Sequence, residues 1–282
     1  MSLPTTTEQG ATLEQLRDSL TTYMETIARV PIELFESEHF IAENEKKQLI
    51  EEGALPVFLP ARIQTEKETA EATYFALAAL NAARARYGQG FEREQLRTIY
   101  AEALHKGKKL FGKQNPVQTI NKEYISNISG TGYQGGETSG ITHHFAHSGI
   151  LKQLIELCEL GRITNAFYQD YPGAQERIGT LYSGFYEREI SIASEHQSSA
   201  TVFDLIIRRL GYELITGTPT FDEQQKQQRT TKINTLDERV QLHLETLREH
   251  TRPLQQATAT IHTSIEQAIN TYFALYEKMR TR

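Results

Sequence analysis

Apolar residues along most of the chain recur every three or four positions, the spacing that places them on one side of an α-helix. Between positions 12 and 30 they are Leu13, Leu16, Leu20, Met24 and Ile27. Thr12 and Gln15 form a capping box at the start of this predicted helix, and Pro31 ends it. The first part of the chain is therefore expected to be helical.

The same spacing predicts further helices over residues 69–87, 93–110, 117–128, 147–160, 174–194, 201–210, 236–250 and 253–279. Strand-like alternation is scarce. The one candidate for an extended piece is residues 54–63, where Pro56 and Pro60 oppose both a helix and a central strand. The acidic stretch from Glu33 to Glu52 is expected to be an exposed helical excursion. We predict an all-α fold, a multi-helix bundle that forms a single domain over residues 1–282.

Composition places the chain among ordinary globular proteins, with 38% hydrophobic and 23% charged residues in a length of 282. The formal charge of -6 has the wrong sign for a general nucleic-acid binder. No apolar stretch approaches the roughly 18–20 residues that cross a bilayer, and the N-terminus lacks a signal-peptide pattern. A single cysteine, Cys158, gives no sign of an oxidising compartment. We expect a cytoplasmic protein that binds neither nucleic acid nor membrane.

Residues 130–140 hold five of the chain's 18 glycines. The glycines read Gly130-x-Gly132-x-x-Gly135, but they follow a helix-like segment and not a strand. A dinucleotide fold needs this motif inside a βαβ unit. A turn that lets two helices approach closely is therefore favoured over a nucleotide site.

Three of the nine histidines, His143, His144 and His147, lie within five residues where a helix is predicted to begin. The pairs are separated by three and four positions, so either pair can direct its imidazoles at one point, as helical metal sites require. They share a side with apolar residues of the following helix, and we expect that side to be buried. A buried imidazole needs a partner, which is a metal, a carboxylate or a backbone carbonyl. The pattern alone leaves these alternatives open.

Residues 128–133, Ile-Ser-Gly-Thr-Gly-Tyr, are followed by glycines and then by His-Phe-Ala-His-Ser-Gly at 144–149. This run resembles the metal-site segment of glycerol dehydrogenase and related iron- or zinc-dependent alcohol dehydrogenases. Residues 18–25, Asp-Ser-Leu-Thr-Thr-Tyr-Met-Glu, are similar to the family's helix Asp-Ala-Leu-Ala-Thr-aromatic-x-Glu, whose Asp binds the metal. Residues 76–80, 179–181 and 260–262 resemble later motifs of the family in the same order.

The resemblance implies the fold of that family's C-terminal helical metal-binding domain, a dehydroquinate synthase-like domain, with a probable insertion at about residues 35–69. The family's N-terminal dinucleotide-binding domain has no counterpart in this sequence. NAD(P) is therefore not expected to bind this chain alone. The expected partner is a separate dinucleotide-binding chain, which would supply the missing half, or a second copy of this chain.

Carried over residue by residue, the resemblance makes Asp18 and His144 the first two metal ligands, with His143 as an alternative to His144. His147, Gly132 and Glu137 would line the substrate pocket. On its predicted helix, Asp18 points away from the apolar stripe, as an ordinary solvated aspartate also would.

The family's third ligand is a histidine before a Gly-Thr-Leu, and this sequence has Pro172 at that position. Proline cannot bind a metal, so Glu137 or Glu176 would have to substitute for the missing histidine.

Two functions follow. In the first, the chain is the metal and substrate half of an alcohol or polyol dehydrogenase, in which zinc or iron polarises the hydroxyl group of a small hydroxylated substrate. In the second, it is a non-catalytic helical subunit for ligand binding or assembly. The Asp18 motif and the histidine cluster favour the first, whereas the absent third histidine favours the second.

Overall fold

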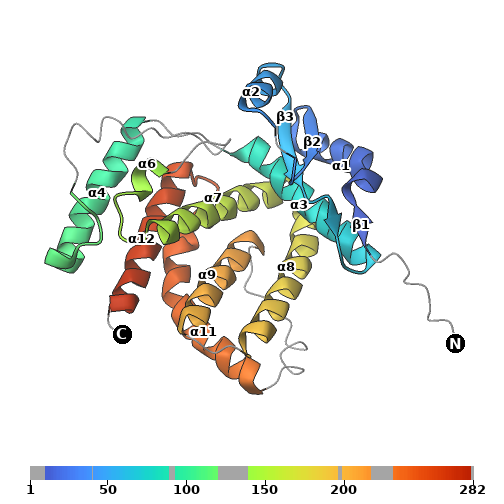
Figure 1. Cartoon of the computed structure of the whole chain (residues 1–282). Helices are drawn as coiled ribbons and strands as arrows, with labels where there is room; N and C mark the ends of the chain where they lie inside the picture. Colours follow the sequence, from blue (N-terminus) through green and yellow to red (C-terminus); the bar gives the residue numbers. More distant parts are fainter. Residues whose placement is uncertain are drawn as a thin grey trace. The chain divides into compact units, whose positions relative to one another are not determined.

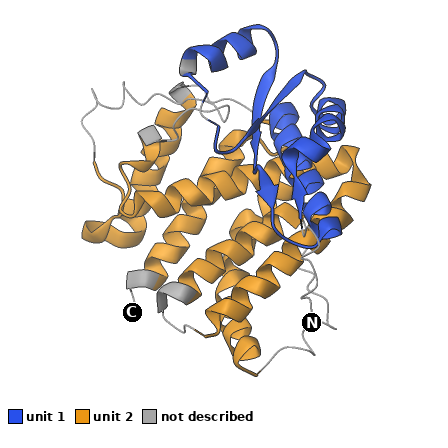
Figure 2. Cartoon of the chain, turned by 45° about the vertical axis from the view of Figure 1, so that its right-hand side comes forward, with its two compact units in different colours: residues 1–87 blue, residues 88–282 orange. Residues whose placement is uncertain are grey.

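In a computed structural model of the chain, the described residues are 10–39, 41–88, 93–119, 139–195, 199–216 and 231–280. They are mostly helical, which confirms the expected class, although four short strands are also present. The chain divides into two compact units, residues 1–87 and 88–282 (Figure 2). Compactness does not show whether a unit folds by itself, so the single domain over residues 1–282 stays a prediction.

Unit 1 contains two long helices, one short helix and two small sheets. In chain order its elements are β1 (Ala11–Thr12), α1 (Leu13–Ala28), β2 (Ile32–Glu36), α2 (Glu43–Glu51), β3 (Leu55–Leu59), β4 (Arg62–Ile63) and α3 (Lys67–Tyr87) (Figure 1). Helix α1 packs against α3. Strand β1 pairs antiparallel with β4, and β2 pairs parallel with β3.

Helix α1 begins with the predicted capping box. The Thr12 hydroxyl accepts from the Gln15 N–H at 3.4 Å, and the Gln15 side chain accepts from the Thr12 N–H at 3.1 Å. The apolar stripe is buried except at Leu16, which is half-buried, and Leu20 and Met24 are fully inaccessible to solvent. Arg29 ends the helix in the left-handed conformation at φ 62°. Local sequence alone therefore sets both the start and the buried side of this helix.

Extended structure in unit 1 is more extensive than predicted. The expected piece at residues 54–63 is present as β3 and β4. The expectation of a helical excursion from Glu33 to Glu52 is wrong at its beginning, because Glu33 to Glu36 lie in β2, and correct for the residues of α2. In β2 and β3 alternate side chains are buried, Ile32 and Leu34 in one strand and Val57 and Leu59 in the other, and this pattern has period 2.

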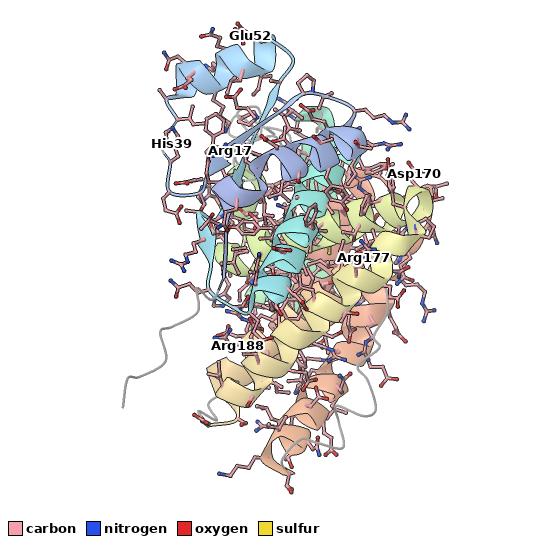
Figure 3. The ribbon with its side chains drawn as sticks, turned by 90° about the vertical axis from the view of Figure 1, so that its right-hand side faces the viewer. Arg17, His39, Glu52, Asp170, Arg177 and Arg188 are labelled. Carbon is pink, nitrogen blue, oxygen red and sulfur yellow. The ribbon has the colours of Figure 1, made fainter. Side chains whose placement is uncertain are left out.

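The outer edge of β2 is closed by side chains of α1. The Pro31 carbonyl and the Ser37 N–H bond to β3, so the peptide groups of Ile32 and Leu34 alternate away from it. Glu25 Oε1 accepts from the Ile32 N–H at 3.1 Å, and Arg17 Nη1 donates to the Leu34 carbonyl at 2.6 Å. Arg17 is labelled on α1 in Figure 3. These side chains occupy the positions that a further strand would use.

Unit 2 is a helical bundle. Its elements are α4 (Arg93–Phe111), the 3-10 turn η1 (Gly112–Gln114), α6 (Ser139–Thr142), α7 (Ser148–Asp170), α8 (Pro172–Ala193), α9 (Ser199–Thr216), α11 (Thr231–Thr251), the 3-10 turn η2 (Arg252–Gln255) and α12 (Ile261–Arg280). Helix α7 packs against α12 on one side and α9 on another (Figure 1).

Two glycines set the close approach of α7 and α9. A Cβ atom on Gly161 would lie 2.9 Å from the Leu214 Cβ, and one on Gly211 would lie 2.7 Å from a Leu157 methyl. Each glycine therefore receives a leucine from the facing helix. A larger residue at Gly161 would force the helices apart. The nearest atom there is the Leu214 Cβ, which cannot move away without its backbone.

Two predicted helices in unit 2 are wrong in part. Val117 forms an isolated antiparallel bridge with Phe145 and is not helical, and residues from 120 onward in that prediction lie outside the described residues. The helix expected over residues 253–279 is divided: Pro253 lies in η2, Gln256 is extended, and α12 begins at Ile261. None of the helices in the described part of the chain combines the length and apolar character needed to cross a membrane.

The edge contact of β2 predicts the effect of Glu25→Ala. The substitution leaves the N–H of Ile32, a residue that is 7% exposed, without its acceptor. We expect the free energy of unfolding to fall by about 1–3 kcal/mol, measured by urea denaturation followed by circular dichroism. Glu14→Ala, which removes an exposed pair with Arg17, is the control and should cost less than about 1 kcal/mol. Equal losses in the two variants would contradict the role given to Glu25.

Candidate functional site

The three clustered histidines lie on a turn between two helices, which we call the histidine turn, residues 143–147. Helix α6 ends at Thr142, and α7 begins at Ser148. The expectation that His143, His144 and His147 share one helix is therefore wrong. Spacings of three and four residues do not bring these imidazoles to one side, because the backbone between them is not helical.

A contact with a segment that is distant along the chain keeps the backbone of this turn from being helical. Phe145 bridges to Val117, the Gln118 N–H donates to the His144 carbonyl, and the Ala146 N–H donates to the Pro116 carbonyl, each at 2.8 Å. A helix through the turn would need these peptide groups for itself. The bridge satisfies them in an extended geometry instead.

Two tyrosines fix the bridge from neighbouring helices. The Tyr272 hydroxyl of α12 donates to the Ala146 carbonyl, and the Tyr100 hydroxyl of α4 donates to the Gln118 carbonyl. Burial, and secondarily the neighbouring Tyr276, raises the pKa of Tyr272, so its hydroxyl stays a proton donor at neutral pH. Neither tyrosine was predicted from the sequence, because the carbonyls they bind lie far from them along the chain.

His144 is the most enclosed of the three histidines. Its side chain is half-buried, with its ring edge-on to Tyr100 at 5.8 Å between centroids. Burial lowers the pKa of His144 below its ordinary value, and the nearby His143 lowers it further. The imidazole is therefore neutral at pH 7, the form that binds metals.

His143 and His147 are exposed, which makes the expectation of a fully buried side wrong for both. The His147 ring lies 6.4 Å from that of Tyr276. Its backbone has φ 56° and ψ 48°, the left-handed region that costs a residue with a Cβ about 1–2 kcal/mol. Strain of this kind is common at sites where the surrounding structure holds a side chain in place.

Of the remaining predicted site residues, Asp18 belongs to unit 1 and the other two lie outside the described residues. Asp18 lies exposed on α1 in unit 1, on the side away from the buried stripe, as predicted. Its convergence with His144 stays a prediction, since the two units are described separately. Gly132 and Glu137 lie outside the described residues.

Pro172, at the position of the family's third ligand, is exposed and starts α8. Glu176, the substitute ligand in the described part, is also exposed and stands one turn further along. Among the residues that the structure describes, no group of three or more His, Cys, Asp or Glu side chains is placed to hold a metal ion.

A network of charged side chains joins three helices of unit 2 and was not predicted. Glu213 of α9 accepts from Arg209 at 2.8 Å and, through both carboxylate oxygens, from Arg248 of α11 at 2.6 and 2.7 Å. The Arg209 guanidinium lies 4.6 Å from the ring centre of Tyr186 of α8, whose hydroxyl donates to Asp237. The hydrogen bonds that Arg248 donates to Glu213 raise the pKa of Arg248. A four-residue charge spacing inside an apolar helix, Arg209 to Glu213, was the signal available in the sequence.

No family model, curated protein or solved structure matches the chain. The resemblance to the metal-dependent alcohol dehydrogenases therefore depends on the motifs quoted above. The finer expectation, a dehydroquinate synthase-like domain, stays a prediction.

Removing Glu213 should test the charged network. Glu213→Ala leaves two guanidinium groups, of which Arg209 is 2% exposed, without their carboxylate. We expect a loss of about 3–5 kcal/mol in the free energy of unfolding, measured by urea denaturation. Glu71→Ala, which removes an exposed ion pair with Lys67, should cost less than about 1 kcal/mol. A loss below 1 kcal/mol in Glu213→Ala would show that the network adds little.

The left-handed backbone of His147 gives a second prediction for this region. Both His147→Gly and His147→Ala remove the imidazole, but glycine adopts this φ without steric cost. The glycine variant should be more stable than the alanine variant by about 1 kcal/mol in thermal or urea unfolding. If alanine proved as stable as glycine, the strain assigned to this backbone would be absent.

Proposed function

We propose that this chain is the metal- and substrate-binding half of a metal-dependent alcohol or polyol dehydrogenase, with a weakened metal site at the histidine turn. One observation carries the proposal: the half-buried His144 and the exposed His143 are neighbours on a turn held by the bridge between Phe145 and Val117, and burial lowers the pKa of His144. Two neighbouring imidazoles suit zinc or ferrous iron, which bind nitrogen ligands well.

The donors fit a weak site better than a closed catalytic one. Catalytic zinc sites have three protein ligands and an open position for substrate. The histidine turn offers two imidazoles, and Asp18 would be the third ligand only if it converged with them. We therefore expect low affinity for the metal and partial occupancy in the purified protein.

The chain's own residues would orient the metal ligand. Tyr100 limits the rotation of the His144 ring, and the bridge between Phe145 and Val117 fixes the backbone that carries it. Residues that orient a metal ligand typically change metal affinity by about 10–100-fold. When bound, the metal would polarise a substrate hydroxyl, and a nicotinamide held by another domain or chain would accept the hydride.

A specific observation favours a second candidate, a non-catalytic helical subunit for ligand binding or assembly. Pro172 occupies the third-ligand position and is built into the first turn of α8, where its fixed φ suits a helix start. Its role there is to begin a helix, and the described neighbours supply no imidazole in its place. In this candidate the histidine turn has only a structural role in packing. The chain then functions by binding a ligand or another subunit on its surface.

Metal analysis of the full chain distinguishes the two candidates. The first candidate predicts that the purified protein binds zinc below one equivalent and that His144→Ala and Asp18→Ala abolish this binding, measured by elemental analysis after dialysis. Because burial lowers the pKa of His144 below the ordinary histidine value of about 6.5, protons should compete with the metal for this imidazole only at pH values below that figure. His262→Ala, a half-buried histidine on α12, is the matched control and should retain zinc.

Equal zinc contents in the wild type and in all three variants would remove the site and leave the second candidate. Loss of zinc in His144→Ala but not in Asp18→Ala would keep a metal at the histidine turn while excluding the convergence of Asp18 with it.

A further inference from the structure

The edge of β3 that faces away from β2 carries peptide groups that form no hydrogen bond within the described residues. The Leu55 N–H and the Leu59 carbonyl bond toward β2. Bonding direction alternates along a strand, so the peptide groups of Pro56 and Phe58 point to the opposite edge. We call this part of the strand, Pro56 to Phe58, the β3 edge. It offers two carbonyl acceptors and one N–H donor to an added strand.

The sequence of β3 suits an edge that is open over a short length. Pro56 lacks an N–H, and on an edge strand this loss breaks no ladder bond. Beyond Phe58 the edge is closed, because the Tyr74 hydroxyl of α3 donates to the Pro60 carbonyl at 2.7 Å. On the other strand, side chains of α1 occupy the outer edge of β2. An added strand can therefore pair with this sheet at the β3 edge and not beside β2.

Three stacked rings lead across the sheet to the β3 edge. Phe35 and Phe58 are opposite each other in the register, with ring centroids 5.6 Å apart and planes within 29°. His39 stacks on the Phe35 ring at 5.7 Å. The two phenylalanines lie on the side of the sheet away from the buried Val57, and Phe58 is 37% exposed. Because the stack ends on the strand with the open edge, a side chain of an added strand would lie next to the Phe58 ring.

The charge of unit 1 defines the chemistry of a partner. Residues 1–87 hold 14 Asp and Glu against 8 Lys and Arg, so they carry the whole formal charge of -6. Glu33 lies opposite Pro56 on the side of the ring stack, is exposed, and forms no ion pair with the described residues. A guanidinium group stacks on aromatic rings and pairs with carboxylates. A partner strand should therefore carry cationic side chains, arginine above all.

A second copy of this chain would fit the β3 edge poorly. Each copy contributes one donor, the Phe58 N–H, so two paired edges would form at most two hydrogen bonds. A different strand has an N–H at every residue except proline and can satisfy all three open groups. Two copies would also bring two acidic surfaces together, which costs electrostatic energy. The occupant that fits is therefore a basic strand from another protein.

We propose that the β3 edge binds an extended, basic segment of another protein as a third strand of the β2–β3 sheet. Its backbone would pair with Pro56 and Phe58, as in other cases of strand addition. A cationic side chain opposite Phe58 would stack on that ring, and one opposite Pro56 would extend over the proline to Glu33. The attraction between opposite charges would make binding depend on salt.

A labelled synthetic peptide of alternating arginine and threonine tests the proposal on the full chain, with binding followed by fluorescence anisotropy. The wild type should bind the peptide, and more weakly as the salt concentration rises. Phe58→Ala removes the ring and should weaken binding about tenfold. Phe58→Pro also removes the open N–H and should weaken it further. Neither variant loses a bond to β2, so both should fold, which circular dichroism checks.

Matched variants separate the β3 edge from the general acidity of unit 1. Glu33→Gln removes the carboxylate beside the ring stack and should weaken binding about threefold. Glu14→Gln, an exposed glutamate of α1, makes the same charge change elsewhere and should bind like the wild type. Ile50→Ala, a 40% exposed apolar residue of α2, is the control for Phe58 and should also bind like the wild type.

N-methylated peptides separate strand pairing from charge attraction alone. Alternate N–H groups of an added strand point at the sheet, so methylating the amide nitrogens of one residue type should abolish binding, and methylating the other type should not. Equal affinities of the two methylated peptides, or of Phe58→Pro and the wild type, would overturn the proposal. A self-association of the chain that Phe58→Pro abolishes would also overturn it, because a second copy would then occupy the edge.

Discussion

Buried carbonyl groups that lie outside regular pairing need a donor, and helix side chains supply that donor throughout the described structure. Tyr74 of α3 donates to the Pro60 carbonyl at 2.7 Å, and Tyr100 and Tyr272 serve the bridge beside the histidine turn. The same arrangement closes the end of α9, where the last carbonyls have no partner within the helix. There Tyr168 donates to the Ile215 carbonyl at 2.5 Å. Tyrosine suits this task because its ring fills the core while its hydroxyl reaches the loop or helix end.

This constraint explains which predictions from the sequence were correct. Helix α1 was predicted with its capping box because Thr12, Gln15 and the apolar stripe are all local to it. The histidine turn was mispredicted as helical because its conformation depends on Val117 and on Tyr272, which is 126 positions from the carbonyl it binds. No spacing pattern inside residues 143–147 contains that information.

The extended conformation of β2 was not predicted, for the same reason. Residues 33–36 are two glutamates around Leu34 and Phe35, which is not a strict alternation, and their pairing partner lies beyond a whole helix in the sequence. Proline at positions 56 and 60 marked the partner segment as extended, whereas nothing in β2 itself did so. The candidate site follows the same division: the cluster of histidines was visible as a motif, but the burial of His144 and the exposure of His143 and His147 depend on the distant contacts that open the turn.

Helix α11 carries charged residues on two sides, one that faces neighbouring helices and one that faces solvent. On its inner side, Arg248 and Asp237 are bound to side chains of α9 and α8, which fixes the rotation of the helix about its axis. That rotation determines which residues remain outside, since residues three, four and seven positions apart share a side. If α11 turned by one position about its axis, Leu242, which is 72% exposed, would move toward the core. The network between α8, α9 and α11 thus determines which residues of α11 are exposed.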